Sequence, residues 1–311
     1  MLKYSQSQRK EVQMIIQKLT SLTQEQTVQI NELQQICMTA DRQGRELFLS
    51  NDINYHKEMP CFYLGYEDDE LVGVLVVFAP TMDTAEISAY VHPDHRRIGV
   101  FSALLEDART VMQDYKITKE LMVTDAAGVI CREILCKWQA VLSHSEYLLI
   151  YHGGEKQVRF PFEARCLVRE AVVNDLPEMI EMNMVGFGES EEDAAHMVHE
   201  NFNHALTRCF VGQLDQEIFG LANVREEGAD YYICGFNIAP EHRGTGMGRY
   251  LLYQILNILR LETDKTITLE VDSTNHTAYM LYTTSGFDVA SQADYYLLRP
   301  RINTHSLQSE C

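Results

Sequence analysis

The chain has 311 residues and a formal net charge of −19 at pH 7, with 26 Lys and Arg against 45 Asp and Glu. A length of this order predicts two domains, and a negative charge of this size argues against nucleic acid or an anionic membrane as a partner. The same charge suits a cationic substrate, although a charge that only keeps the protein soluble would have the same sign.

In chain order, the first half predicts helices followed by strands. Residues 1–20 and 24–38 place apolar side chains at helical spacing. Residues 61–66 and 71–78 have the composition of two strands, and the acidic turn between them predicts a hairpin. A third strand over 85–91 leads through a turn into another helix.

The second half begins after a predicted linker at 152–156. Its patterns predict a strand over 164–170, helices that begin near residues 175 and 190, a hairpin over 209–222, and a strand over 231–238. Pro240 ends this last strand, since proline removes a ladder donor. A helix with apolar residues from Met247 to Leu259 follows, and the tail after Pro300 is polar.

Three glycines alternate at the start of that helix, at Gly244, Gly246 and Gly248. Each costs a helix about 1 kcal/mol relative to alanine, so the run predicts a close approach of the backbone to a ligand. The free N–H groups and the positive dipole at a helix N-terminus favour an anion, and Arg243 and Arg249 add positive charge. We therefore expect a phosphate-binding turn. The alternative is a tight strand-to-helix connection without a ligand.

The spacing of this turn differs from that of a P-loop or a dinucleotide-binding fingerprint. Arg243-x-x-Gly246-x-Gly248 after a strand instead resembles the pyrophosphate-binding segment of the GNAT N-acetyltransferase superfamily. A strand over 266–271, followed by Asn275, Ala278, Leu281-Tyr282 and Gly286-Phe287, is similar to the late segment of that family.

The resemblance implies acetyl-CoA as co-substrate and a mixed α/β (α+β) fold with a twisted, mostly antiparallel sheet flanked by helices. It implies that Tyr282 is the general acid that protonates the leaving thiolate; a packed aromatic residue is the alternative. Asn275 would contact the pantetheine arm or cap a helix. The cofactor-binding residues that it implies are Phe236, Asn237, Ile238, Arg243, Gly244, Thr245, Gly246, Met247, Gly248, Arg249 and Asn275.

The turn occurs twice in the chain. Val91, Pro93, Arg96 and Gly99 precede Ile238, Pro240, Arg243 and Gly246 by a constant offset of 147 (238 − 91 and 246 − 99). The chain is therefore interpreted as two tandem GNAT-like domains, residues 1–157 and 158–311. The N-terminal copy has Phe101 in place of Gly248 and Leu135 in place of Tyr282, so we expect it to be degenerate and to have a structural role.

The histidines, the cysteines and the apolar segments of the chain do not indicate a further site. His196, His199 and His204 could bind a metal by their spacing, but no Cys or Asp completes a ligand set, so we expect surface histidines and no metal. The eight cysteines have no Cys-x-x-Cys spacing, which is typical of reduced thiols in the cytoplasm. Apolar runs are short, and the first residues lack the apolar segment of a signal peptide, so we expect neither a transmembrane helix nor export.

These features together predict a cytoplasmic N-acetyltransferase. It would move an acetyl group from acetyl-CoA to a primary amine of a small molecule or peptide, an acceptor that the charge suggests is cationic. The general base stays open between Glu270, Glu170 and a water molecule, and neither the acceptor nor the oligomeric state follows from the sequence. A CoA-binding or regulatory module without catalysis is the alternative function.

Overall fold

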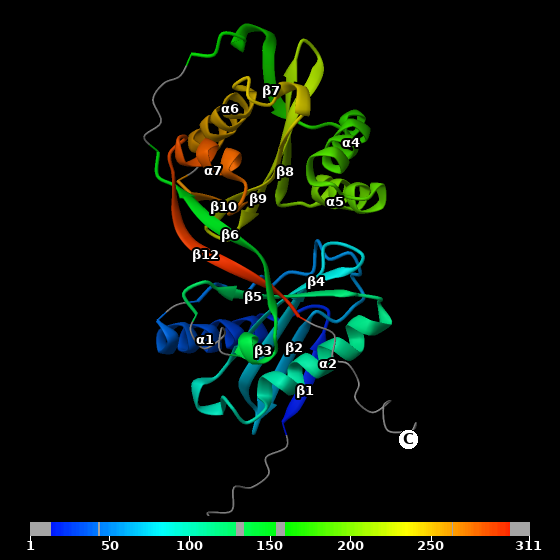
Figure 1. Cartoon of the computed structure of the whole chain (residues 1–311), viewed down its shortest axis with the longest axis vertical. Coiled ribbons are helices and arrows are strands. Elements are labelled where there is room, and N and C mark those ends of the chain that lie inside the picture. The colour runs from blue at the N-terminus through cyan, green and yellow to red at the C-terminus, as the bar shows by residue number, and fades with distance from the viewer. Residues whose placement is uncertain (1–13, 43, 129–133, 154–158, 263, 299–311) are drawn as a thin grey trace, which may run out of the picture. The chain divides into compact units, whose positions relative to one another are not determined.

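The computed structural model describes residues 14–42, 44–128, 134–153, 159–262 and 264–298. The chain forms two compact units (Figure 1). Unit 1 comprises Met1–Asn51, His56–Ala79 and Asp83–Glu120, and unit 2 comprises Asp52–Tyr55, Pro80–Met82 and Leu121–Cys311. The sequence copies 1–157 and 158–311 are defined by repetition, and that boundary stays a prediction. The predicted linker after Gly153 and the polar tail lie outside the described residues.

Unit 1 is an antiparallel sheet with two long helices. Its strands follow one another in the order β1 (Ile15–Leu19), β2 (Phe62–Glu67), β3 (Glu70–Phe78) and β4 (Thr84–Val91), and its helices are α1 (Gln24–Asp41) and α2 (Val100–Asp114). The helix predicted over 1–20 is wrong where the structure describes it, because Ile15–Leu19 pairs with β2 as an edge strand. Two adjacent β-branched residues, Ile15 and Ile16, favour that conformation.

Unit 2 contains a larger sheet. Its strand order is β5 (Lys119–Asp125), β12 (Phe287–Leu297), β6 (Val141–Tyr151), β11 (Thr266–Asp272), β10 (Asp230–Ile238), β9 (Glu217–Glu227), β8 (Thr207–Leu214) and β7 (Cys166–Glu170). Neighbouring strands are antiparallel except β10 and β11, which are parallel. The mixed α/β fold with mostly antiparallel sheets is therefore confirmed. No helix in the described part of the chain is long and apolar enough to span a membrane, and the cytoplasmic location stays a prediction.

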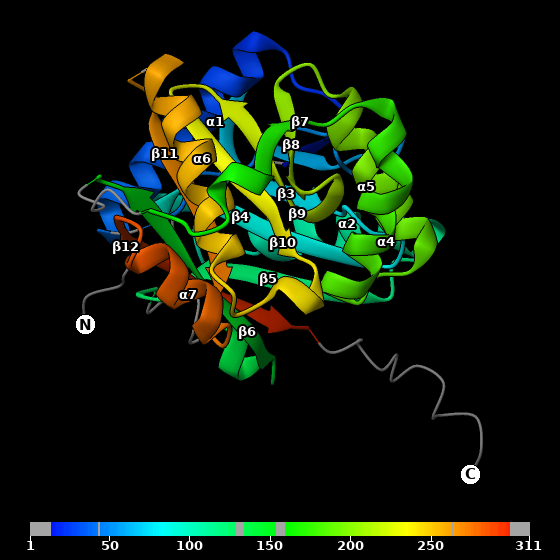
Figure 2. The same cartoon turned by 90° about the horizontal axis from the view of Figure 1, so that it is seen from above.

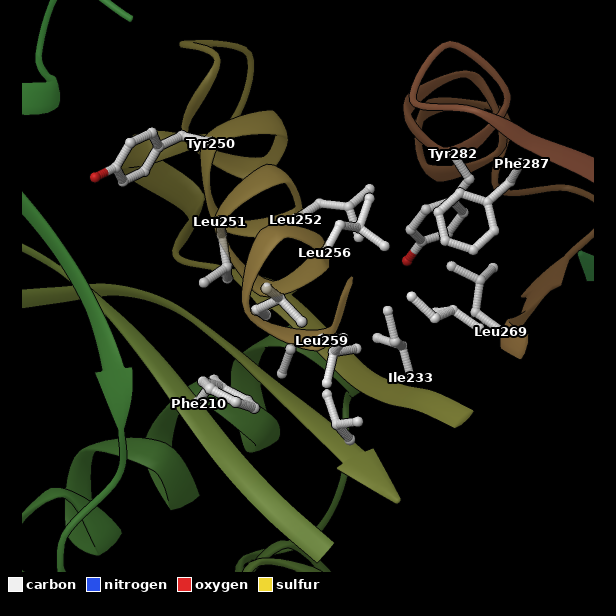
Figure 3. Packing of buried hydrophobic residues seen from close by; sticks show 14 of the residues in the cluster. Phe210, Ile233, Tyr250, Leu251, Leu252, Leu256, Leu259, Leu269, Tyr282 and Phe287 are labelled. Carbon is white, nitrogen blue, oxygen red and sulfur yellow. The ribbon is translucent and has the colours of Figure 1, made fainter. Parts of the chain in front are cut away.

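Helices cover both faces of this sheet. They are α4 (Leu176–Phe187), α5 (Glu191–Asn203), α6 (Met247–Glu262) and α7 (His276–Thr283). Figure 1 and Figure 2 show α6 and α7 on one side of unit 2 and α4 and α5 on the other. The main core lies under α6, where Leu251 and Leu252, both labelled in Figure 3, are completely buried. Ile255 of the same helix is also completely buried.

The closing strands of the two sequence copies are exchanged. β6 comes from the N-terminal copy, yet it lies between β11 and β12 of the C-terminal copy, with Leu149 opposite both Leu269 and Val289. β12 in turn pairs on its other edge with β5, where Tyr295 lies opposite Val123. The sheet of unit 2 is thus built from both copies, and β6 and β12 run side by side in Figure 1.

Candidate active site

Two parallel strands of unit 2 pair over only part of their length. β10 pairs with β11 from Asp230 to Ile233, opposite Thr266 to Leu269, and both strands then continue without pairing with each other. The pairing of β10 with β9 shifts between Cys234 and Asn237, and Gly235 in between has φ +59°. This is a β-bulge, which bends a strand away from its neighbour. On the edge of β10 that faces β11, the backbone groups beyond Ile233 therefore form no ladder hydrogen bonds with a described strand.

The glycine turn follows β10 directly and leads into α6. Gly244 has φ +74° and Gly246 has φ +93°, conformations that favour glycine whether or not a ligand is present. Gly248 differs, because its φ is not positive and a side chain there would make only ordinary van der Waals contacts. A Cβ there would lie 3.4 Å from Ile238 and 3.6 Å from Leu281, so α6 begins in contact with both β10 and α7.

The N-terminal copy contains the same backbone turn, but its arginine is neutralised. Arg97 and Gly99 have φ values of +64° and +101°, close to those of Gly244 and Gly246. The guanidinium of Arg96 forms two hydrogen bonds to Asp41, of 2.7 and 2.9 Å, and this carboxylate raises the pKa of Arg96.

The arginines of the C-terminal turn keep their charge unpaired. Arg243 donates to the carbonyl of Ile238 at 2.8 Å and to Oδ1 of Asn237 at 3.4 Å, and Arg249 donates to Thr284 at 2.7 Å. Among the described residues, neither guanidinium forms an ion pair. Asn237 is itself buried and donates to the carbonyl of Met182 on α4 at 2.6 Å, so its side chain attaches the bulged strand to that helix.

Tyr282 lies on α7, over the bulge. Its ring centroid is 6.0 Å from that of Phe236 on β10 and 6.0 Å from that of Phe287. Burial raises the pKa of the phenol. No hydrogen bond to its hydroxyl is formed by any residue that the structure describes, and Figure 3 shows the hydroxyl pointing toward Leu256 and Ile233. The phenol thus stays protonated and has a donor to offer.

Asn275 caps α7, since its Oδ1 accepts from the N–H of Ala278 at 3.1 Å. The capping role is confirmed, and the contact with pantetheine stays a prediction. Thr245 donates to the carbonyl of His242 at 2.6 Å, and Met247 is buried in the core. The structure therefore brings Phe236, Ile238, Gly248 and Tyr282 to one place, whereas Asn275 lies at the opposite end of α7 from Tyr282.

The two carboxylates considered as bases have different surroundings. Glu170, on edge strand β7, accepts from Arg208 at 2.8 Å and forms an ion pair with it. Glu270 lies on β11 at the point of divergence, where its Oε2 accepts from the hydroxyl of Tyr232 at 3.1 Å. Of these two carboxylates, only Glu270 lies where β10 and β11 stop pairing with each other.

Two of the histidines considered as metal ligands contact neighbouring side chains. The ring of His196 lies 4.6 Å from that of Tyr55, and Nε2 of His204 is 3.4 Å from Asp52. Among the residues described, no group of three or more His, Cys, Asp or Glu side chains could hold a metal ion.

This chain is similar to known proteins in sequence and in fold. A sequence model of the Acetyltransferase (GNAT) family matches residues 27–129 and 176–287. Mycothiol acetyltransferase of Rothia mucilaginosa (strain DY-18) is 25% identical over 278 residues, covering 75% of this chain and 76% of that protein. A GCN5-related N-acetyltransferase from Sphaerobacter thermophilus has 16% identity and a TM-score of 0.70 over 92% of this chain and 96% of its own. A tandem GNAT protein from the clavulanic acid biosynthesis pathway has 14% identity and a TM-score of 0.66 over 93% and 99%.

Proposed function

Because this chain belongs to the Acetyltransferase (GNAT) family and is an acyltransferase, we propose that its C-terminal copy transfers an acetyl group from acetyl-CoA to a primary amine of a small molecule or peptide. The observation that carries this proposal is the divergence of β10 from β11 beneath Tyr282. The N-terminal copy lacks a tyrosine at the matching position, where Leu135 is buried.

Binding of acetyl-CoA would use three features of the C-terminal copy. The backbone N–H groups at the start of α6 would receive the pyrophosphate, because the first N–H groups of a helix have no partner within it. Arg243 and Arg249 supply positive charge there, in a molecule with a net charge of −19. The unpaired edge of β10 at Phe236 and Ile238 would bind the amides of the pantetheine arm.

The chemistry needs a nucleophile, an oxyanion donor and an acid. The neutral amine attacks the thioester carbonyl, so a C–N bond forms while the C–S bond breaks, and the nitrogen gives one proton to a general base, for which Glu270, Glu170 and a water molecule are the candidates. A backbone N–H at the bulge would stabilise the oxyanion. Tyr282 would donate to the leaving sulfur, and the raised pKa of this phenol keeps its proton in place at neutral pH.

The acceptor would be a cationic amine. The net charge of −19 supports this choice, because it repels anionic acceptors and attracts cations over short range. The name of the Rothia relative adds an amine related to mycothiol as one candidate to include, at an identity of 25%.

Thiol release from acetyl-CoA with a panel of amines tests the proposal. The panel should contain polyamines, aminoglycosides, amino acids and amino-terminal peptides. Release with at least one amine and N-acetylation of that amine by mass spectrometry would support transfer. Tight CoA binding by calorimetry without release from any amine would contradict it and would favour the module without catalysis.

A further inference from the structure

Neighbouring strands of unit 2 place three polar side chains in one row. Thr124 of β5 lies directly opposite Asp294 of β12, and Asp294 lies directly opposite Ser145 of β6 on the other edge of β12. Side chains that stand directly opposite on neighbouring strands share a face of the sheet, with Cβ atoms about 5 Å apart. All three are buried, with exposed fractions of 7%, 5% and 7%. We call Thr124, Asp294 and Ser145 the buried polar row.

Asp294 is hydrogen-bonded through only one of its two oxygens. Its Oδ1 accepts from the hydroxyl of Ser145 at 2.7 Å and from Nε2 of Gln292 at 2.9 Å. Among the described residues, no donor bonds to its Oδ2 and no cation pairs with the carboxylate. A buried carboxylate without a counter-charge is costly, because two neutral donors replace only part of the hydration that it loses.

Thr124 gives an independent sign of a ligand. Its Oγ1 is buried and forms no hydrogen bond with any described residue, although the residue stands opposite a carboxylate. Buried polar atoms without partners are rare in folded proteins, and each costs stability. Oγ1 of Thr124 and Oδ2 of Asp294 therefore belong to directly opposed residues, and both lack a partner in the part of the chain that the structure describes.

The matching place in the C-terminal copy is apolar. Val271 of β11 follows Thr124 by the repeat offset of 147 (271 − 124), and it lies opposite Tyr147 of β6. Val271 is 6% exposed, and Tyr147 packs against the core under α6. The fold thus accepts an apolar pair at this position, so packing alone does not explain the polar pair.

The two unpartnered oxygens indicate the chemistry of the ligand. A carboxylate oxygen only accepts hydrogen bonds, and a hydroxyl oxygen can accept them as well. A primary ammonium group has three N–H donors and a positive charge, so a single group can bond to both oxygens and balance the charge of Asp294. A water molecule could form the same hydrogen bonds, but it would leave that charge uncompensated.

We propose that the buried polar row binds the primary ammonium group of a small molecule. Oδ2 of Asp294 and Oγ1 of Thr124 each accept one N–H, and Ser145 holds the carboxylate through Oδ1. Both sequence copies build the site, since β5 and β6 belong to the N-terminal copy and β12 to the C-terminal copy. The site is separate from the divergence of β10 and β11 and goes beyond the proposed acetyl transfer, so binding rather than turnover tests it.

Thermal unfolding of the full chain in two salts tests the site. Methylammonium chloride and tetramethylammonium chloride at equal concentration supply the same charge, but only methylammonium has N–H donors. The wild type should melt about 2 °C or more higher in saturating methylammonium, because a ligand that binds only the folded state stabilises it. Equal melting temperatures in the two salts would overturn the site and leave a bound water as its occupant.

Two nearly isosteric variants assign the effect to the row. Thr124→Val removes the unpartnered hydroxyl, and Asp294→Asn removes the charge while its amide oxygen still accepts from Ser145 and Gln292. Both should abolish the difference between the two salts. In tetramethylammonium both should melt at the wild-type temperature or higher, since each removes a buried group that lacks a partner. A lower melting temperature of Thr124→Val in both salts would show a structural role and overturn the proposal.

Matched controls are Thr266→Val, at the exposed start of β11, and Asp288→Asn, at an exposed position of β12. Both should keep the wild-type difference between the salts. A difference that survives in Thr124→Val and in Asp294→Asn would place the bound amine elsewhere and overturn the row as its site. If Asp294→Asn does not fold, Thr124→Val decides alone, because its Oγ1 makes no hydrogen bond with a described residue that the substitution could break. Thiol release with the amine panel is measured separately, so either result leaves the proposed acetyl transfer untouched.

Discussion

Leu149 of β6 lies directly opposite Leu269 of β11, and both side chains are buried in the core under α6. One belongs to the N-terminal sequence copy and the other to the C-terminal copy. The parallel strand that lines the candidate site is therefore paired on one edge by a strand from the other copy. Residues of the degenerate copy thus help to build the sheet that carries the site.

A fragment of residues 158–311 should consequently fail to fold. It lacks β6, so β11 and β12 would each have an unpaired edge, and apolar residues of the core would face water. We expect aggregation or loss of defined secondary structure by circular dichroism. As a control, the full chain cut at a protease site inserted between Gly153 and Arg159 should elute as one particle in size-exclusion chromatography. A soluble and active 158–311 fragment would contradict the exchange of strands.

Tyr282→Phe should lower turnover by roughly tenfold or more, because general acid catalysis contributes about 10²–10⁴-fold. Packing on Phe236 and Phe287 is kept, so CoA affinity should not change. The matched control is Tyr279→Phe on the same helix, whose ring contacts Tyr147. Unchanged turnover with chemistry limiting the rate would reduce Tyr282 to a packing role.

The pH profile provides a second test of Tyr282. Burial raises its pKa above the ordinary value of about 10, so the acid form persists through neutral and mildly alkaline pH. The ratio of wild-type to Tyr282→Phe turnover should therefore stay constant from about pH 7 to pH 9. A ratio that falls steadily over this range would mean that the phenol loses its proton there.

Gly246→Ala and Gly99→Ala form a matched pair. Both glycines have positive φ, +93° and +101°, so an alanine should cost about 1–3 kcal/mol of stability at either site. Only Gly246→Ala should also weaken CoA binding, because we place the pyrophosphate at the C-terminal turn. Equal loss of CoA affinity in both variants, measured by calorimetry, would indicate two cofactor sites.

Glu189→Gln should raise the melting temperature at pH 7. Burial, and then the charge of Asp193, raise the pKa of Glu189, and its Oε2 has no partner among the described residues. A carboxyl with a raised folded-state pKa favours folding when it is protonated, and that contribution is lost as the pH rises through the folded-state pKa. The gain should therefore shrink as the pH falls through the raised folded-state pKa, and it should be gone below about pH 4, near the ordinary pKa of glutamate. Exposed Glu181→Gln on α4 is the control, and a lower melting temperature in Glu189→Gln would contradict the assignment.

The sequence by itself determined the family, the C-terminal glycine turn and the position of Tyr282. These features depend on residues close together in the chain: the spacing of Arg243, Gly246 and Gly248 sets one turn, and Leu281-Tyr282 before Gly286 sets one helix end. The helical spacing of Met247 to Leu259 likewise predicts α6, because the backbone hydrogen bonds of a helix form between residues of the same short segment.

Only the tertiary structure decided the contacts between residues that are far apart in the chain. A strand can pair with a segment from any part of the chain, so no local pattern predicts that β6 pairs with β11. For the same reason, the local pattern of residues 15–19 predicts a helix, although they form an edge strand paired with β2. The ion pair of Arg96 with Asp41, which are 55 positions apart in the chain, likewise follows only from the tertiary structure. Asn223 is visible in the sequence as a polar residue in an apolar strand, but only the fold shows that its Oδ1 is buried without a hydrogen-bond partner among the described residues.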